Sequence, residues 1–140
     1  MKILVAVDGS TYTKRMLAYL AAHDEWLGDA HQYTVLHAVP AVPPRAAAVL
    51  DKDLLKSYYA DEGEKVLKTV RSFFSKQGIK ADYINKVGSA ADLIAASADK
   101  GKFDLLILGS HGHGTIANLV MGSVATKVMA NCSTPVLLIR

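Results

Sequence analysis

The stretch Leu105-Leu-Ile-Leu-Gly-Ser-His-Gly-His-Gly-Thr-Ile-Ala-Asn-Leu-Val-Met-Gly-Ser123 decides the fold of this chain of 140 residues. Its first four residues are apolar and predict a buried strand, its glycines predict a loop, and Gly122 and Ser123 predict the start of a helix. Glycines let backbone N–H groups approach an anion closely, and a helix N-terminus adds unpaired donors and a partial positive charge. This order of strand, glycine loop and helix is therefore typical of a phosphate site.

The charge pattern of the same region favours an anionic ligand. After Asp104 the chain continues to Arg140 without an aspartate or glutamate, whereas His111, His113 and Lys127 are present. Since no carboxylate there would repel an anion, we expect the phosphates of a nucleotide at the loop.

Length and composition limit the classes of protein to consider. With 51% hydrophobic residues, the chain fits one domain over residues 1–140 with a well-filled core. The formal net charge is only +3 and no long run of lysine or arginine occurs, which argues against nucleic-acid binding. Cys132 has no partner for an internal disulfide, and no apolar run reaches the length of a membrane span or a signal sequence. We therefore expect a soluble, cytoplasmic protein without membrane insertion, with Cys132 as a small buried side chain.

Short apolar runs alternate with longer segments of helical spacing along the chain. The runs predict strands at residues 2–7, 33–39, 83–87, 105–108 and 136–139. The segments between them predict helices at about residues 13–27, 54–78, 90–100 and 122–130.

Four local details accompany these elements. Gly63 is a weak point in the second helix, and Ser89 can cap the third. In the last helix, Val124 and Val128 are expected to face inward. Prolines at positions 40, 43 and 44 predict an irregular stretch until about residue 51.

The alternation predicts an α/β fold with an open, five-stranded parallel sheet and helices on both faces, as in Rossmann-like proteins. Ligands bind such sheets at the carboxyl ends of the strands, where the strand order reverses. The loops that would meet there carry Asp8, residues 37–40 and the glycine loop.

Two common phosphate motifs fit the glycine loop poorly. Gly109-x-x-x-x-Gly114 begins like a P-loop, but Thr115 and Ile116 stand where that motif needs Lys and Ser or Thr. Gly112-x-Gly114-x-x-Ala117 meets the loose dinucleotide pattern, yet no acidic residue follows to hold a ribose hydroxyl. The pattern that remains is Gly109-x-x-Gly112, nine residues, then Gly122-Ser123.

At these residues the chain resembles the universal stress protein family in its ATP-binding branch, whose nucleotide signature is Gly-x-x-Gly, nine residues, Gly-Ser/Thr. The opening Lys2-Ile-Leu-Val-Ala-Val-Asp-Gly-Ser10, the strand Asp104-Leu-Leu-Ile-Leu-Gly109 and the closing Pro135-Val-Leu-Leu-Ile139 are also similar to the family. The resemblance covers nearly the whole chain. It implies the open five-stranded sheet of adenine nucleotide α-hydrolase-like proteins, and a homodimer.

The resemblance further implies a site for ATP, or for ADP or AMP, built by three segments. The ends of the first two strands would contact the adenine, with Asp8 near any Mg²⁺ that the nucleotide brings. The glycine loop would form the ribose and phosphate pocket, and the start of the last helix would hold the phosphates. The implied nucleotide-binding residues are Ala6, Val7, Asp8, Ala38, Gly109, Ser110, His111, Gly112, His113, Gly122, Ser123 and Val124. Ala38 departs from the usual valine of the family, and Ala6 from the proline of some members, so packing on the base could be looser.

Several of these residues also have a purely structural interpretation. Asp8 could cap the first helix, and His37 is best interpreted as a hydrogen-bonded core histidine. The pair His111-x-His113 lacks a third ligand, so a dedicated zinc site is disfavoured.

No set of catalytic residues can be identified from the sequence. Phosphoryl transfer needs a metal clamp, charge stabilisation and a positioned nucleophile, and the glycine loop contains no lysine or arginine. We therefore expect an ATP-binding sensor or regulator in stress response. Two alternatives stay open: a slow Mg-dependent ATP hydrolase that uses Asp8, and a dimeric interaction module that needs no nucleotide.

The apolar strand at 136–139 favours a homodimer. If the strand order follows the family, this strand lies at a sheet edge, and antiparallel self-pairing across a two-fold axis would cover it.

Overall fold

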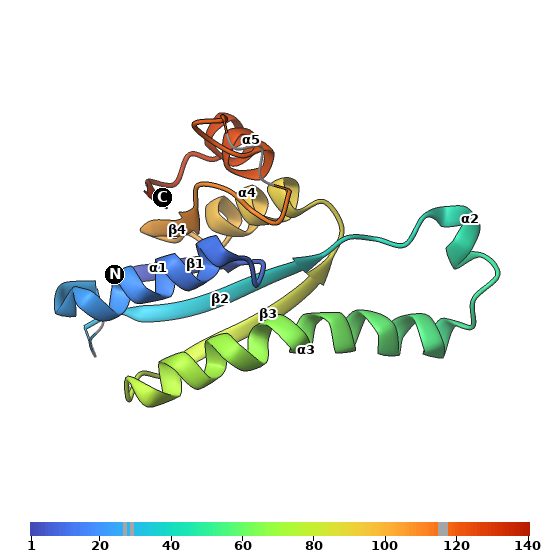
Figure 1. Cartoon of the computed structure of the whole chain (residues 1–140), viewed down its shortest axis with the longest axis horizontal. Coiled ribbons are helices and arrows are strands. Elements are labelled where there is room, and N and C mark those ends of the chain that lie inside the picture. The colour runs from blue at the N-terminus through green and yellow to red at the C-terminus, as the bar shows by residue number, and fades with distance from the viewer. Residues whose placement is uncertain (27, 29, 115–117) are drawn as a thin grey trace.

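The computed structural model describes residues 1–26, 28, 30–114 and 118–140, and its elements alternate along the chain (Figure 1). The strands are β1 (Lys2–Val7), β2 (Gln32–Val39), β3 (Ala81–Val87), β4 (Leu105–Gly109) and β5 (Val136–Ile139). The helices are α1 (Thr11–Ala22), the short 3₁₀ helix η1 (Asp24–Trp26), α2 (Pro44–Ala47), α3 (Lys52–Lys76), α4 (Ala90–Lys100) and α5 (Ser123–Asn131).

The strands form one five-stranded sheet of order β3-β2-β1-β4-β5, and all the pairings are parallel. The predicted fold class is therefore confirmed. The strand order reverses at β1, because the chain continues to β2 on one side and later to β4 on the other. Parallel sheets bind ligands in the crevice that opens at such a point.

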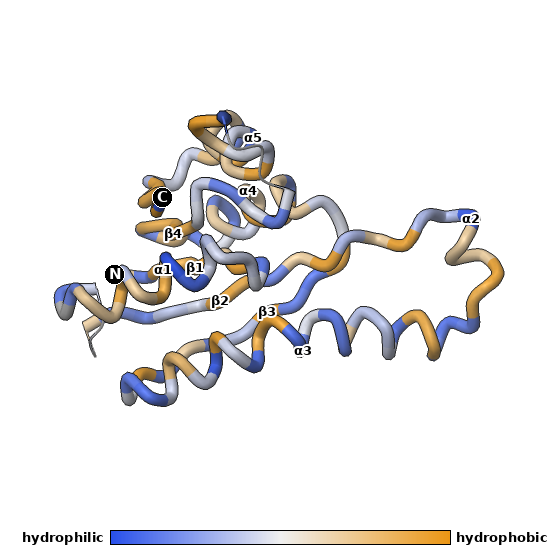
Figure 2. The backbone as a smooth tube through the Cα atoms, in the orientation of Figure 1, coloured by the Kyte–Doolittle hydropathy of each residue, from blue (hydrophilic) through white to orange (hydrophobic). Residues whose placement is uncertain are grey.

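Helices cover both faces of the sheet. In β1, Ile3 and Val5 pack with residues of α1 and α3, whereas Leu4 packs with residues of α4 and α5. Successive strand residues point to opposite faces, so a strand covered on both sides is apolar almost throughout. Figure 2 shows this difference: β4 is hydrophobic, whereas α3 alternates between hydrophobic and hydrophilic segments because only one of its faces is buried.

The first helix ends earlier than predicted. α1 stops at Ala22 rather than near residue 27, and His23 has an extended backbone. The ring Nδ1 of His23 donates to the carbonyl of Tyr19 at 2.7 Å, and the two rings stack. This side-chain bond occupies a carbonyl that a continuing helix would use, which explains the early end. Leu27, predicted to belong to this helix, lies outside the described residues.

Gly63 does not weaken the second predicted helix. α3 is continuous, and Gly63 is buried within it. A Cβ at this position would collide with the side chain of Asn85 on β3. The glycine therefore permits a close approach of helix and strand rather than a break.

Other predictions need smaller corrections. The stretch expected to be irregular contains α2, with Pro44 at a first-turn position where proline is favoured. Ser89 precedes α4, but its side chain makes no capping hydrogen bond. In α5 the buried residues are Ala125 and Val128, whereas Val124 is 38% exposed. Cys132 is half-buried rather than buried. None of the helices in the described part of the chain combines the length and hydropathy needed to span a membrane.

Candidate functional site

A cavity of about 560 Å³ opens at the carboxyl ends of β1, β2 and β4, where the strand order reverses. Its size suits a small organic ligand. Every predicted site residue except Ser110 lines it: Ala6, Val7, Asp8, Ala38, Gly109, His111, Gly112, His113, Gly122, Ser123 and Val124. The structure thus brings together residues that are distant in sequence.

Ser110 lies behind the cavity wall and is completely buried. Its N–H donates to the carbonyl of Ile139, and its carbonyl accepts from the N–H of Gly122, both at 2.7 Å. The amides of Ser110 and Gly122 are therefore engaged within the protein. A Cβ on Gly122 would lie 3.1 Å from the Cα of His111, so this junction has little room for a side chain. Ser110 fixes the glycine loop to β5 and to the start of α5.

The start of α5 presents the donors that an anion needs. The hydrogen bond from the N–H of Thr126 to the carbonyl of Gly122, at 3.0 Å, closes the first turn of this helix. The amides of Ser123, Val124 and Ala125 come before that bond, so they have no helical acceptor. All three residues line the cavity. Together with the helix dipole, these amides form an environment that favours negative charge.

The two histidines of the loop hold its shape. Nε2 of His111 donates to the carbonyl of Leu119, and Nδ1 lies against Oγ of Ser110, each at 2.8 Å. Nε2 of His113 donates to the backbone carbonyl of Asp8 at 2.7 Å. These bonds connect the glycine loop to the end of β1 and to the segment before α5.

One carboxylate oxygen of Asp8 accepts hydrogen bonds from residues at the start of α1. Oδ1 accepts from the N–H of Ser10 at 2.9 Å and from Oγ1 of Thr13 at 3.0 Å, which supports the structural interpretation of Asp8. Oδ2 lies on the side of the loop, since a Cβ on Gly112 would be 2.7 Å from it. No group of three or more potential metal ligands occurs in the described ranges. The carboxylate of Asp8 is a hard oxygen donor of the kind that Mg²⁺ prefers.

His37 is a buried histidine, as predicted, and is 7% exposed. Its Nδ1–H donates to the carbonyl of Val7 at 2.8 Å, across the register pair that these two residues form. The bond fixes the ring at the floor of the cavity, which His37 also lines.

The cavity has an apolar side and a polar side. Near β2 the lining includes Ala38, Val39 and Pro40, with Ala90 and Ile94 from α4. Near β4 it consists of the glycine loop and the start of α5. Because β1 separates β2 from β4, these two sides are about 10 Å apart. The arrangement suits a ligand with a flat apolar group at one end and an anionic group at the other.

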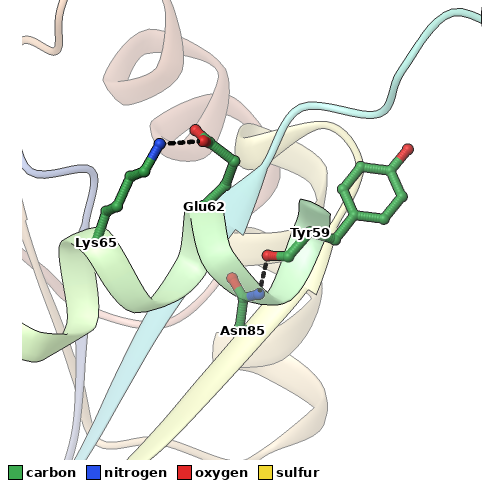
Figure 3. Close-up of polar contacts among 4 residues, drawn as sticks. All are labelled: Tyr59, Glu62, Lys65 and Asn85. Atoms are coloured by element: carbon green, nitrogen blue, oxygen red, sulfur yellow. Dashed lines mark hydrogen bonds and ion pairs between the residues drawn. The ribbon is translucent and has the colours of Figure 1, made fainter. Parts of the chain in front are cut away.

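Sequence reasoning missed one wall of the cavity, which α3 provides through Glu62, Lys65 and Val66. Glu62 and Lys65 form an ion pair with 2.6 Å between Oε1 and Nζ (Figure 3). The hydrogen bond that Lys65 donates to the Glu62 carboxylate raises the pKa of Lys65. The spacing of three and four residues places all three side chains on one side of the helix. That spacing was the available signal, but nothing local indicated which side would face the cavity.

Sequence comparison supports the resemblance noted above. The model of the universal stress protein family matches residues 1–140. The chain is 32% identical over 139 residues to a universal stress protein of Synechocystis sp., an alignment that covers 99% of this chain and 42% of that protein. It is 31% identical over 139 residues to a universal stress protein of Thermus aquaticus, and that alignment covers 99% of this chain and 97% of that protein. The chain thus spans less than half the length of the first relative and nearly all of the second.

Solved structures share the fold. The hypothetical protein MJ0577 matches with a TM-score of 0.82 at 24% identity, covering 99% of this chain and 94% of that one. A universal stress protein of Archaeoglobus fulgidus in complex with dAMP matches at 0.69, with 24% identity and 100% and 98% coverage. One from Arabidopsis thaliana with AMP bound matches at 0.71, with 16% identity and 99% and 90% coverage. From the family match over its full length and the two sequence relatives, this chain belongs to the universal stress protein family.

Proposed function

We propose that this chain binds an adenine nucleotide, with ATP as the preferred ligand, and acts as a nucleotide-responsive regulator in stress response. The observation that carries the proposal is the cavity, which joins the glycine loop, the start of α5 and the ends of β1 and β2. Two structural relatives hold dAMP and AMP, which supports adenine as the base.

The polar and apolar sides of the cavity indicate where each part of the nucleotide would lie. Its phosphates would accept hydrogen bonds from the amides of Ser123 and Val124 and from the Ser123 hydroxyl. The ribose would lie against Gly109 and Gly112, which line the cavity between its two sides. The adenine would lie on the apolar side, against the backbone of Ala6 and Ala38. Asp8 would meet a Mg²⁺ ion carried by ATP.

Regulation would act through the segment before α5. Leu119 and Val120 are 50% and 76% exposed, and the carbonyl of Leu119 is bound by the His111 ring. A nucleotide against the glycine loop would favour one arrangement of this apolar surface over others, and a partner would then recognise that arrangement.

We also propose a homodimer through β5, which is an edge strand of the sheet. The carbonyl of Pro135 accepts from Leu106 of β4, and that of Ile139 accepts from Ser110, the residue after β4. Since strand residues alternate in direction, Val136 and Leu138 direct their backbone groups outward. Self-pairing across a two-fold axis would satisfy these groups. Sedimentation at micromolar concentration should give twice the 15.0 kDa of one chain, and a monomer would contradict the dimer.

Calorimetric titration tests nucleotide binding. Protein freed of bound nucleotide should bind ATP and AMP but not GTP. Excess ATP should also raise the thermal unfolding temperature, because a ligand at about 100 times its Kd stabilises the native state by about 2.7 kcal/mol. Mass spectrometry of material released from heat-denatured protein identifies any nucleotide that it retains. Absence of measurable binding for both adenine nucleotides would refute the proposal.

A further inference from the structure

The charged lining of the cavity is a poor match for a phosphate ligand. Apart from histidines, the charged residues that line it in the described ranges are Asp8, Glu62 and Lys65. Two carboxylates and one ammonium group give the lining a net negative charge while the histidines are neutral. Binding of a polyphosphate in this cavity therefore depends on whether the ammonium group of Lys65 pairs with the ligand or with Glu62.

Lys65 is held by a bond that is easily exchanged. It pairs with Glu62 one turn earlier on α3 (Figure 3), and the two side chains are 71% and 34% exposed. Ion pairs in contact with water contribute little to stability, because solvent screens them and the long side chains lose entropy. A lysine can therefore leave such a pair for an anion of higher charge.

Packing places α3 across the end of β1 from the glycine loop. Val66 lies against Gly9, where an added Cβ would be 3.0 Å from Cγ2 of Val66. Asp8 precedes Gly9, and its Oδ2 lies beside Gly112. Lys65, next to Val66, thus stands at the cavity rim on the side opposite the loop.

The backbone that carries Lys65 is anchored on both sides of Glu62. Asn85 donates to the carbonyl of Tyr59 at 3.0 Å, next to the close contact at Gly63 (Figure 3). The hydroxyl of Tyr59 accepts from the N–H of Val42 at 2.8 Å, which ties the helix to the segment after β2. The helix is fixed relative to the cavity, so only the side chain of Lys65 has to move.

We propose that Lys65 is a further phosphate contact, which exchanges Glu62 for the nucleotide and makes affinity increase with the number of phosphate groups. The inference rests on the proposed nucleotide binding and assigns the preference for ATP over AMP to a particular side chain. Glu62 holds Lys65 at the rim while no anion is present, and it opposes binding until Lys65 has turned to the phosphates.

The ligand series adenosine, AMP, ADP and ATP tests the proposal. Dissociation constants are measured by calorimetry at constant ionic strength for the wild type and for Lys65→Met. The matched control is Lys68→Met, which removes the same charge from an exposed position on α3 that does not line the cavity. Circular dichroism and thermal unfolding show that each variant keeps its fold.

We expect Lys65→Met to leave adenosine binding unchanged and to weaken ATP binding by about tenfold, with AMP affected by about twofold or less. Lys68→Met should change all four constants by less than about twofold, and Lys65→Arg should restore most of the ATP affinity. Glu62→Gln should strengthen ATP binding, because Lys65 then has no carboxylate to leave.

Equal weakening of all four ligands by Lys65→Met, or none, would overturn the role of Lys65 while leaving nucleotide binding intact. The same loss with Lys68→Met would overturn it too, since only the net charge of the helix would matter. Failure of the wild type to bind any of the four would refute the proposed function, and the role of Lys65 with it.

Discussion

The two walls of the cavity are built in different ways. The backbone wall consists of Gly109, Gly112, Gly122, Ser123 and Val124. Its position is fixed by main-chain hydrogen bonds such as the one from Gly122 to Ser110, at 2.7 Å. The side-chain wall consists of Glu62, Lys65 and Val66, and its charged groups form an exposed ion pair.

This difference separates affinity from selectivity. Donors that are already in position cost little to order when a ligand binds, so the backbone wall should determine how tightly any phosphate is held. Exposed side chains are adjustable, so the side-chain wall should determine which nucleotide is preferred. Variants of the backbone wall should therefore weaken ATP and AMP alike, unlike variants at Lys65.

Removal of one amide from the backbone wall should have the largest effect. Ser123 is the first residue of α5, and Gly122 before it is extended, with φ −72° and ψ 168°. Proline fits this position without loss of a helical hydrogen bond. Ser123→Pro removes the N–H and the hydroxyl, whereas Ser123→Ala removes the hydroxyl alone. We expect Ser123→Pro to bind ATP about tenfold more weakly than Ser123→Ala does. The reason is that a hydrogen bond to a charged group contributes about 1.5–3 kcal/mol to the free energy of binding.

Calorimetry measures this difference, and thermal unfolding without ligand serves as the control. The two variants should unfold at similar temperatures, since the helix keeps all its internal bonds. Equal ATP affinities for Ser123→Pro and Ser123→Ala would show that the amide of residue 123 donates nothing to the ligand.

The second prediction concerns the space between the loop and β1. A Cβ on Gly112 would lie 2.7 Å from Oδ2 of Asp8, whereas one on Gly114 would meet no described atom within 4 Å. Gly112→Ala should therefore displace the loop or the carboxylate, at a cost of about 1 kcal/mol or more, and weaken ATP binding by about fivefold to tenfold. Gly114→Ala is the matched control and should change affinity by less than about twofold. A similar loss in both variants would contradict a specific role for the approach of Gly112 to Asp8.

The backbone wall could be predicted from sequence because its determinants are local. An apolar run, glycines and a Gly-Ser pair follow one another within residues 105–123. They predict in turn a strand, a loop and the start of a helix. The order of the strands in the sheet followed from the family resemblance. Together these placed nearly every predicted residue around one cavity.

The side-chain wall could not be predicted because its position depends on tertiary packing. More than forty residues separate Lys65 from the glycine loop. At Gly63, α3 comes close to Asn85 of β3, whereas helix propensity alone predicts a weak point in the helix at this glycine. The early end of α1 has a similar origin, since it depends on the bond from His23 to Tyr19. In α5, the apolar spacing did not distinguish Val124 from Ala125 as the buried residue.

The third prediction tests what positions the side-chain wall. In an exposed helix, replacing glycine by alanine stabilises a protein by up to about 1 kcal/mol. At Gly63 the new Cβ would force the Asn85 side chain out and break its bond to Tyr59. We therefore expect Gly63→Ala to be neutral or destabilising in the wild type. In an Asn85→Ala background it should become more favourable by about 1 kcal/mol.

Urea unfolding of the four proteins of this double-mutant cycle provides the measurement. Asn85→Ala alone is the control for loss of the hydrogen bond. Strict additivity of the two changes would show that helix and strand are not held by this contact.

The smallest effect should come from a side chain that holds the turn after α5, at the opposite end of that helix from the backbone wall. Asp99 of α4 accepts from the N–H of Ser133 and Thr134 at 3.1 and 3.0 Å, in the turn between α5 and β5. These hydrogen bonds, that of Ser133 most strongly, lower the pKa of Asp99 below its ordinary value of 3.8. A carboxyl group with a lowered pKa stabilises the fold above its unfolded-state pKa, and this contribution is lost as the pH falls through the folded-state value. Asp99→Asn should therefore lower the urea midpoint at pH 7, and its difference from the wild type should shrink steadily as the pH falls below about 4. A difference of the same size at pH 7 and at the lowest pH where both proteins fold would show that the negative charge of Asp99 does not hold the turn.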